Sequence, residues 1–495
     1  MTETAPLRIL FATPEVAPPV KTGGLGDVSA ALPAALAEAG LEVRVLVPAY
    51  PTLLAAFPGR VALAQVERPG AELLPATISC VALQPGLELL LVECPACYER
   101  HGGPYQTAAA TTGPTTRCAS ACSPGSPHCW PAATRRSTGA RTSCTATTGR
   151  RHCRRPICAT GTRTARPASR RFTTSRSVGL FPMARIHALD LPVAAMTIEG
   201  VEFHGKISFL KAGLQHSDRL TTVSPTYARE ICEPEHGFGL DGLLRHRRDR
   251  RSGDLVGILN GIDTRQWNPA TDRSIAARYG AHSLALKPLN RAALGERLKL
   301  ALQADTPLLG MISRITRQKG ADLVIDAAPE LLARGARLVV LGSGDADLEA
   351  RWRALAAAHP GRVAVQIGFD EALAHLIEAG ADLFLMPSRF EPCGLNQMYS
   401  PAYGTPPVVR ATGGLADTVV DCTPRTLADG SANGFSFGPP TTDALLAAID
   451  RALEAWREPE TWRRLQRSGM ARDWGWGPAA RQYIDLYRSC LRAGR

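Results

Sequence analysis

Short apolar runs alternate with amphipathic stretches along most of this chain. Near the start, apolar runs at Leu7 to Thr13, Leu41 to Pro48 and Leu87 to Glu93 have the length and composition of buried strands. Between the first two, Val28 to Ala39 has the apolar spacing of a helix. This β, α, β order predicts a doubly wound parallel sheet in the N-terminal region.

A similar alternation resumes at residue 179 and continues to the end of the chain. Helices are expected at Ile207 to Gln215 and Tyr227 to Cys232, with strands at Arg219 to Val223 and Leu255 to Leu259. After a helix around Lys287 to Gln303, further strands are expected at Leu308 to Ser313, Arg337 to Leu341, Val363 to Ile367, Leu383 to Met386 and Pro407 to Arg410. The pattern therefore predicts a second doubly wound sheet.

The turn-rich phrase Asn260-Gly261-Ile262-Asp263 follows the first of these regions. We therefore expect an N-terminal domain at 1–259, a C-terminal domain at 260–475 and a closing segment at 476–495, with a helix at 478–491. A chain of 495 residues is long enough for two such cores. It contains no apolar run of about 20 residues and no signal-peptide pattern, so we expect a cytoplasmic protein with no membrane partner.

The region 107–178 lacks this periodicity and has an unusual composition. It contains 13 Arg, no Lys and no acidic residue, and so contributes +13 against +12 for the whole chain. It also holds six of the 13 cysteines. The basic charge of the chain is therefore a property of this one segment. Because Ser, Thr, Pro, Gly and Arg dominate and there is almost no apolar periodicity, the segment is expected to be disordered or poorly packed.

One phrase occurs almost twice, as Lys-Thr-Gly-Gly-Leu-Gly-Asp-Val at 21–28 and Ala-Thr-Gly-Gly-Leu-Ala-Asp-Thr at 411–418. A glycine pair lets the backbone come close to a ligand, and a helix that begins there directs N–H groups toward an anion. Two such loops in two similar domains suggest that both domains contact one substrate.

Three loops that follow strands of the second domain carry candidate chemistry, because ligands of open α/β sheets bind at the carboxyl ends of strands. In the first loop, Arg314 and Lys319 could neutralise a diphosphate, although a solvated basic loop is the alternative. In the second, Glu391 could bind sugar hydroxyls or stabilise positive charge, or only cap a helix. Cys393 is expected to shape the pocket, since nothing around it suggests a metal ligand or nucleophile. The third loop contains the second glycine pair.

Taken together, these phrases resemble bacterial glycogen synthases, which are retaining glucosyltransferases with the two-domain GT-B fold. The phrases that carry the resemblance are Lys21 to Leu25, Phe209 to Gly213, Val223 to Ala228, Asn260 to Asp263, Gln318 to Gly320, Ser388 to Leu395 and Thr412 to Thr418. The resemblance covers about 1–106 and 179–495. It implies two Rossmann-like domains that face a central cleft.

The resemblance also implies the reaction and the residues that perform it. Glucose would pass from ADP-glucose to the non-reducing end of an α-1,4-glucan, in glycogen biosynthesis, without a cofactor or metal. Lys319 and Arg314 would hold the diphosphate and Glu391 would lie against the glucose. The other substrate-binding residues implied are Lys21, Thr22, Gly23, Gly24, Asp27, Cys393, Gly394, Leu395, Thr412, Gly413, Gly414 and Leu415.

The family has a His-Asp-Trp and a His-Asn-Leu phrase in its first domain, and neither occurs in this chain. Reading the coding DNA of 107–178 one base earlier permits both: Val-His-Cys-His-Asp-Trp at 144–149 and Thr-Ile-His-Asn-Leu-Ala at 171–176. It also permits Asp-Asn-Ala-Leu-Arg-Phe at 115–120. A compensated frameshift is therefore our preferred hypothesis. The first domain would then lose strands and helices from its middle, and this chain would have little or no activity.

Other interpretations of the segment and of the chain stay open. The segment could be a basic linker, although its cysteine spacing does not fit structural zinc and it lacks the aromatic residues of nucleic-acid modules. A disulfide framework does not suit a cytoplasmic chain. The whole chain could instead use another nucleotide sugar, or be a glucan-binding protein without activity, and no nucleic-acid partner is expected. The oligomeric state, the preferred glucan length and the nucleotide are not fixed by the residues.

Overall fold

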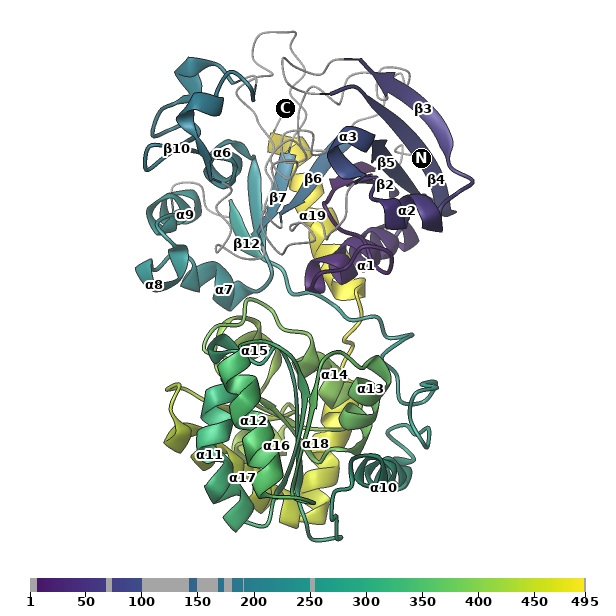
Figure 1. Cartoon of the computed structure of the whole chain (residues 1–495), viewed down its shortest axis with the longest axis vertical. Helices are drawn as coiled ribbons and strands as arrows, with labels where there is room; N and C mark the ends of the chain where they lie inside the picture. The colour runs from purple at the N-terminus through teal and green to yellow at the C-terminus, as the bar shows by residue number, and fades with distance from the viewer. Residues whose placement is uncertain are drawn as a thin grey trace. The chain divides into compact units, whose positions relative to one another are not determined.

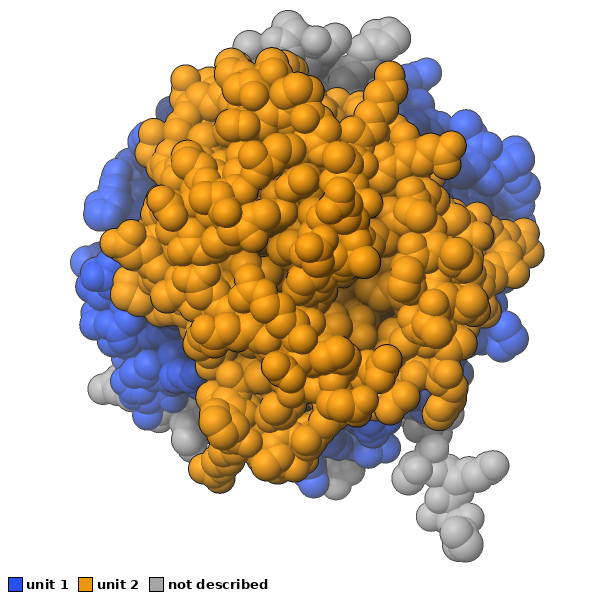
Figure 2. Space-filling view, turned by 90° about the horizontal axis from the view of Figure 1, so that it is seen from below, with its two compact units in different colours: residues 1–223, 228–258, 476–495 blue, residues 224–227, 259–475 orange. Residues whose placement is uncertain are grey.

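The computed structural model describes residues 7–67, 74–99, 142–148, 168–172, 180–189, 191–249 and 254–493. The chain forms two compact units, coloured separately in Figure 2. The first comprises residues 1–223, 228–258 and 476–495, and the second comprises 224–227 and 259–475. The divisions expected from the sequence lie at 259/260 and 475/476. The sequence did not indicate that residues 224–227 belong with the second unit.

The first unit is built on a nine-stranded sheet in the order β12-β11-β7-β6-β1-β2-β5-β4-β3 (Figure 1). Its strands are β1 (Arg8–Ala12), β2 (Glu42–Pro48), β3 (Val61–Val66), β4 (Ala76–Gln84), β5 (Leu87–Glu93), β6 (Thr142–Thr148), β7 (Ala168–Phe172), β11 (Arg219–Thr222) and β12 (Leu255–Gly257). All neighbours are parallel except β3 with β4 and β4 with β5. The predicted parallel sheet is confirmed, with an antiparallel edge that the sequence pattern did not reveal.

Helices and a small antiparallel sheet complete the first unit. The helices are α1 (Gly24–Glu38), α2 (Pro51–Ala56), α3 (Pro95–Tyr98), α6 (Phe209–His216), α8 (Pro234–Gly237), α9 (Asp241–Asp249) and α19 (Gly477–Ala493), and the small sheet joins β8 (Leu180–Pro182), β10 (Lys206–Ser208) and β9 (Glu202–Phe203). Helix α7 (Pro225–Glu230) belongs to the second unit up to residue 227 and to the first unit from residue 228. The predicted closing helix is α19, which buries Tyr483 and Tyr487 in the same core as β1 and β2. The helix expected from Ile207 begins instead at Phe209, because Ser208 caps it by accepting the Lys211 N–H.

Two strands of the segment 107–178 are present in the first sheet. They are β6 and β7, which lie side by side between β1 and β11, whereas we expected strands to be lost from the middle of this domain. Parallel pairing uses backbone groups, which every residue except proline supplies in full, and the threonines of β6 favour extended backbone. The rest of this segment lies outside the described residues, so the expected disorder remains untested there.

The second unit contains a six-stranded parallel sheet in the order β15-β14-β13-β16-β17-β18. The strands are β13 (Leu308–Ile312), β14 (Arg337–Gly342), β15 (Val363–Ile367), β16 (Leu383–Met386), β17 (Pro407–Arg410) and β18 (Phe435–Phe437). The helices are α10 (Lys287–Leu298), α11 (Ala321–Ala333), α12 (Ala346–Ala358), α13 (Glu371–Gly380), α14 (Asn396–Ala402), α15 (Gly413–Thr418), α16 (Pro424–Ala428), α17 (Thr442–Arg457) and α18 (Pro459–Ala471). All five strands predicted here are confirmed.

The strand order contains a reversal in each unit. From β13 the chain adds β14 and β15 on one side, then returns to place β16, β17 and β18 on the other. In the first unit, β2 and β5 lie on one side of β1, while β6, β7, β11 and β12 lie on the other. Crevices that bind ligands form at such reversals, at the carboxyl ends of the strands. The fold therefore points to the loops after β1 and β6 and to those after β13 and β16.

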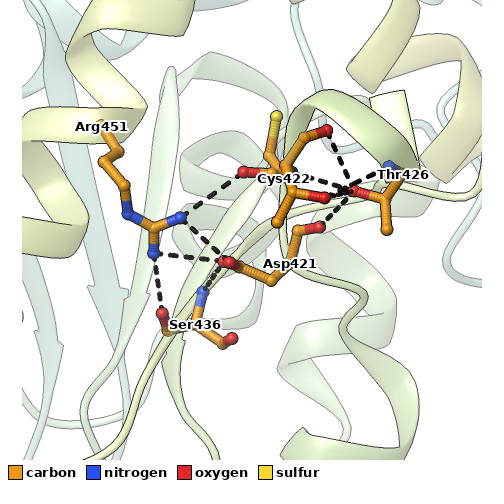
Figure 3. A network of polar contacts seen from close by, with 6 residues as sticks. Asp421, Cys422, Thr426, Ser436 and Arg451 are labelled. Carbon is orange, nitrogen blue, oxygen red and sulfur yellow. Dashed lines mark hydrogen bonds and ion pairs between the residues drawn. The ribbon is translucent and has the colours of Figure 1, made fainter. Parts of the chain in front are cut away.

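A polar network fastens the last strand of the second sheet (Figure 3). The Asp421 carboxylate accepts two bonds from the Arg451 guanidinium, at 3.0 and 3.2 Å, and one from the Ser436 N–H at 2.7 Å. Arg451 also donates to the Ser436 carbonyl at 2.8 Å. The network joins α17 and β18 to the segment that follows α15, and so holds α15 from its C-terminal side.

We expect Asp421→Ala to destabilise the second unit by about 1–3 kcal/mol. The Ser436 N–H would lose its acceptor, and Arg451 would lose its ion pair. Asp421→Asn, which keeps an oxygen for that N–H, should cost about 1 kcal/mol or less, since the pair is partly exposed. Urea unfolding measures both changes. Glu460→Ala, which breaks an exposed pair with Arg463, is the control and should have almost no effect. Equal losses for the two Asp421 variants would contradict this account.

Candidate active site

Three loops meet at the reversal of the second sheet. Residues 313–320 follow β13, residues 387–395 follow β16 and residues 411–415 follow β17, all at the carboxyl edge of the sheet. These are the loops in which the sequence placed its candidate residues. Because β13 and β16 are hydrogen-bonded neighbours, the first two loops leave the sheet side by side.

Lys319 and Glu391 are brought into contact by these two loops. The Lys319 ammonium forms an ion pair with the Glu391 carboxylate, and the Ser388 hydroxyl donates to the same carboxylate oxygen at 3.1 Å. Only 8% of the Glu391 side chain and 18% of the Lys319 side chain is exposed. An ammonium group and a carboxylate 72 residues apart in sequence thus form one nearly buried ion pair at the carboxyl edge of the sheet.

Arg314 belongs to the same loop as Lys319 but is exposed. Its guanidinium makes no ion pair with any residue that the structure describes. Thr316 shapes the loop, because its side chain accepts the Lys319 N–H at the start of a single helical turn, Arg317–Lys319. The two cations therefore differ, since Lys319 is paired and partly enclosed while Arg314 extends into solvent.

Glycines allow the three loops to close on one another. A Cβ atom on Gly320 would lie 2.2 Å from the Pro387 carbonyl oxygen, and one on Gly413 would lie 2.0 Å from that of Glu391. At Gly414 the clash would be with the Cys393 carbonyl oxygen, at 2.1 Å. Gly320 and Gly413 also have positive φ angles of 72° and 45°. The backbone of each loop is therefore packed directly against the next.

This packing corrects one part of the sequence interpretation. The second glycine pair was expected to bring backbone N–H groups close to a ligand. Instead, the Gly414 N–H is shared by the Glu391 and Pro392 carbonyls, both at 3.1 Å, and the Leu415 N–H donates to the Thr412 carbonyl at 3.0 Å. These two amides are engaged within the protein. The close approach that this pair permits is to the Glu391 loop.

The other predicted residues of the second unit form the base of the same group. Cys393 is buried, and Gln397 donates to its carbonyl at 2.9 Å. Gly394 has a φ angle of 75°, and Leu395 precedes the first residue of α14. Thr412 is buried at the start of α15. Their positions agree with a shaping role for Cys393 rather than a reactive one.

The first glycine pair differs from the second in its surroundings. Residues Lys21 to Gly24 are all exposed, and a Cβ on Gly23 would meet nothing within 4 Å. Gly24 begins α1, four residues earlier than the helix expected from Val28. Lys21 pairs with Asp27 at 2.8 Å, with 45% and 34% of these side chains exposed. This loop therefore has open space at its glycine, as the sequence interpretation requires.

Sequence reasoning missed the residue that anchors this first loop. Glu15 is buried, and its two carboxylate oxygens accept the Thr22 N–H at 2.9 Å and the Thr22 hydroxyl at 2.6 Å. The available signal was an acidic residue in an otherwise apolar stretch directly after β1. Glu15 thus fixes the residue that follows Lys21.

Phe369 was also missed, although its exposure is unusual. It follows β15 at the carboxyl edge of the second sheet, and 85% of it is exposed. Large apolar side chains at such an edge contribute nothing to a core. An aromatic residue next to Gly368 just after a strand was the signal in the sequence.

Residues 224–227 add a further support that was not foreseen. The N–H and hydroxyl of Thr226 donate to the two oxygens of Asp417, at 2.8 and 2.6 Å, and the buried Tyr227 ring packs edge-on against Phe390 at 5.5 Å. Asp417 lies in α15 and Phe390 precedes Glu391. This short segment therefore contacts two of the three loops of the site. The repeated phrase contains both Asp27 and Asp417, and they have different partners.

Within the described residues, no helix combines the length and apolar character needed to cross a membrane.

Two family models match most of the chain. The model described as "Starch synthase catalytic domain" matches residues 8–123 and 176–246, and the one described as "Glycosyl transferases group 1" matches residues 296–468. The first match passes over 124–175, which lies inside the segment 107–178 of anomalous composition.

Curated relatives and solved structures agree with these models. The chain is 48% identical to a glycogen synthase of Dechloromonas aromatica, over 98% of this chain and 99% of the relative, and 47% identical to one of Aromatoleum aromaticum, over 98% and 97%. Among solved structures, the catalytic domain of starch synthase IV from Arabidopsis thaliana has a TM-score of 0.79 at 27% identity, covering 98% of this chain and 99% of that one. A sucrose-phosphate synthase from Thermosynechococcus elongatus, at 17% identity and a TM-score of 0.55, shares the fold. The chain therefore belongs to the bacterial glycogen synthase family and has the GT-B fold of two doubly wound α/β domains.

Proposed function

We propose that the site of this chain takes ADP-glucose and transfers its glucose to the non-reducing end of an α-1,4-glucan with retention of configuration. The observation that carries the proposal is the nearly buried Lys319–Glu391 pair at the reversal of the second sheet. It has the two charges that a sugar diphosphate needs, a cation for the diphosphate and a carboxylate for the sugar. The similar starch synthase IV domain is described as bound to ADP and acarbose.

Leaving-group stabilisation would drive the transfer. Lys319, with Arg314 from the same loop, would neutralise the diphosphate as the bond to the anomeric carbon breaks. Glu391 would face the positive charge that develops on the sugar, and the acceptor 4-hydroxyl would attack on the face from which ADP departs. A retaining hydrolase uses two carboxylates about 5 Å apart, whereas this scheme uses one. No metal or cofactor takes part in it.

Phe369 is a candidate for the base of the nucleotide. An exposed aromatic ring at the carboxyl edge can stack on the flat face of a purine, and such stacking is worth about 1–3 kcal/mol per base. Stacking accepts any base. It would therefore add affinity for the nucleotide without selecting ADP-glucose over UDP-glucose.

Two other functions would be separated from this one by simple measurements. A transferase for another nucleotide sugar would prefer UDP-glucose when the two donors compete. A glucan-binding protein without activity would bind glucan as tightly as active relatives do but release no ADP.

The segment 107–178 bears on whether this particular chain is active, and we propose that its coding frame is shifted. The frame one base earlier permits a histidine at position 147, within the last two residues of β6, and another at position 173, directly after β7. β6 is the neighbour of β1 across the reversal of the first sheet, and Lys21 belongs to the loop after β1. The permitted histidines would thus belong to the carboxyl edge where a ligand is expected.

We expect Lys319→Ala to weaken ADP binding at least 10-fold, because one cation of the diphosphate site is lost. Isothermal titration calorimetry of the full chain measures this without requiring turnover. Arg463→Ala, which removes an exposed arginine from α18, is the matched control and should leave the affinity unchanged. If Lys319→Ala bound ADP with unchanged affinity, this loop would not be the binding site of the diphosphate.

Phe369→Ala should weaken ADP binding about 5-fold to 100-fold, in line with the loss of one stacking contact. Phe369→Tyr should retain the affinity, because it preserves the aromatic face. The same calorimetric titration measures both variants. If Phe369→Ala bound ADP as the parent chain does, the base would have to contact another part of the unit.

Sequencing the DNA of codons 107–178 should find one inserted or deleted base near each end of the segment. A chain translated in the earlier frame should release ADP from ADP-glucose in the presence of glucan at least 100-fold faster than the chain as written. Ordinary activity of the chain as written, together with an intact coding sequence, would refute the frameshift.

A further inference from the structure

Two cysteines bracket the first turn of α3. Cys94 is the residue before the helix and Cys97 is its third residue, and the Cys97 N–H donates to the Cys94 carbonyl at 2.9 Å. Three residues along a helical turn separate the Cα atoms by about 5 Å. Disulfides usually join Cα atoms about 4.4–6.8 Å apart. The backbone of this turn therefore already has the spacing that a disulfide requires.

The turn is ordered by a proline, by an aromatic contact and by burial. Pro95 occupies the first helical position and restricts the backbone between the two cysteines. Tyr98 packs edge-on against Tyr50, the residue before α2, with ring centroids 5.8 Å apart. Both cysteines are almost completely buried, with 2% and 1% exposed. Closing a bond here would cost little chain entropy, because the turn is already ordered.

No other pair of this kind exists among the residues that the structure describes. Of the cysteines whose side chains the structure describes, the other five are each at least 14 positions from any other in sequence; they are Cys80, Cys232, Cys393, Cys422 and Cys490. Two thiolates alone do not complete the four-ligand shell of structural zinc. A Cys-x-x-Cys turn in a domain with a βαβ pattern, which β1, α1 and β2 supply here, is instead typical of redox chemistry.

We propose that Cys94 and Cys97 form a reversible dithiol–disulfide couple that a peroxide oxidises. One thiolate attacks the peroxide and becomes a sulfenic acid, and one water molecule is released. The second sulfur then attacks the sulfenic sulfur to form the disulfide, and a second water molecule leaves. The two thiols together lose two protons and two electrons, and the peroxide is reduced to water.

The neighbouring thiol decides the outcome of oxidation. A sulfenic acid with a resolving cysteine one turn away forms a disulfide before further peroxide can convert it to sulfinic acid. Burial hinders bulky thiols from reaching the bond, so a small dithiol would reduce it more readily than glutathione. The couple lies at the carboxyl end of β5, which is separated from β1 by β2 alone. It is thus on the same edge of the first sheet as the loop that carries Lys21.

The test uses the purified full-length chain, first reduced and then exposed to a small excess of hydrogen peroxide. Free thiols are alkylated under denaturing conditions and proteolytic peptides are examined by mass spectrometry. We expect the peptide with Cys94 and Cys97 to lose two hydrogens and both alkylation sites. Cys80 and Cys422, which are half-buried and single, should remain alkylated. Treatment with dithiothreitol should restore both alkylation sites.

Two variants distinguish the couple from general oxidation. Cys94→Ser should abolish the intramolecular disulfide and leave Cys97 as a thiol or a sulfinic acid, while Cys80→Ser should behave like the parent chain. Circular dichroism checks that each variant is folded, and the measurement on the parent chain does not depend on them. Two intact thiols, or sulfinic acids without a disulfide, in the oxidised parent chain would overturn the proposal. None of these results depends on glucan synthesis or ADP binding.

Discussion

The site of the second unit depends on backbone packed directly against backbone. At Gly320, Gly413 and Gly414, a Cβ atom would lie only 2.0 to 2.2 Å from a carbonyl oxygen of the neighbouring loop. A side chain at any of these positions would push the loops apart. Since Lys319 and Glu391 come from different loops, their ion pair exists only because the loops are closed in this way. The chemistry of the site therefore rests on the absence of three side chains as much as on the presence of two.

The repeated phrase serves different purposes in its two copies. A Cβ atom on Gly23 would meet nothing within 4 Å. The loop is fixed instead by Glu15, which accepts two hydrogen bonds from Thr22. In the second copy the glycines are covered by the Glu391 loop, and Asp417 binds Thr226. Similar sequences thus form an exposed loop with open space at its glycine in one unit and a junction between two loops in the other. The glycines allow the same backbone conformations in both copies, but the residues packed around each copy determine what the loop contacts.

Sequence reasoning succeeded where the signal was local. Strands such as Leu383–Met386 are buried along their whole length, so their apolar runs gave both their type and their position. That the loops of Lys319 and Glu391 lie at one edge followed from the rule that loops gather at the carboxyl ends of strands, whereas the ion pair between the two side chains was not predicted. The links through Thr226 and Asp417 could not be predicted, because 191 residues separate them and neither residue shows periodicity. The hydrophobic pattern also could not show that Phe369 is exposed, because a phenylalanine after a strand is usually part of the core.

The strands β6 and β7 present the hardest conflict between sequence and fold. Interior strands of a parallel sheet are covered on both faces and are usually apolar along their length. β6 reads Thr-Ser-Cys-Thr-Ala-Thr-Thr and β7 reads Ala-Ser-Arg-Arg-Phe, yet they pair between β1 and β11. The apolar pattern therefore did not reveal these two strands, because their parallel pairing uses backbone groups, which leave no apolar signal in the sequence.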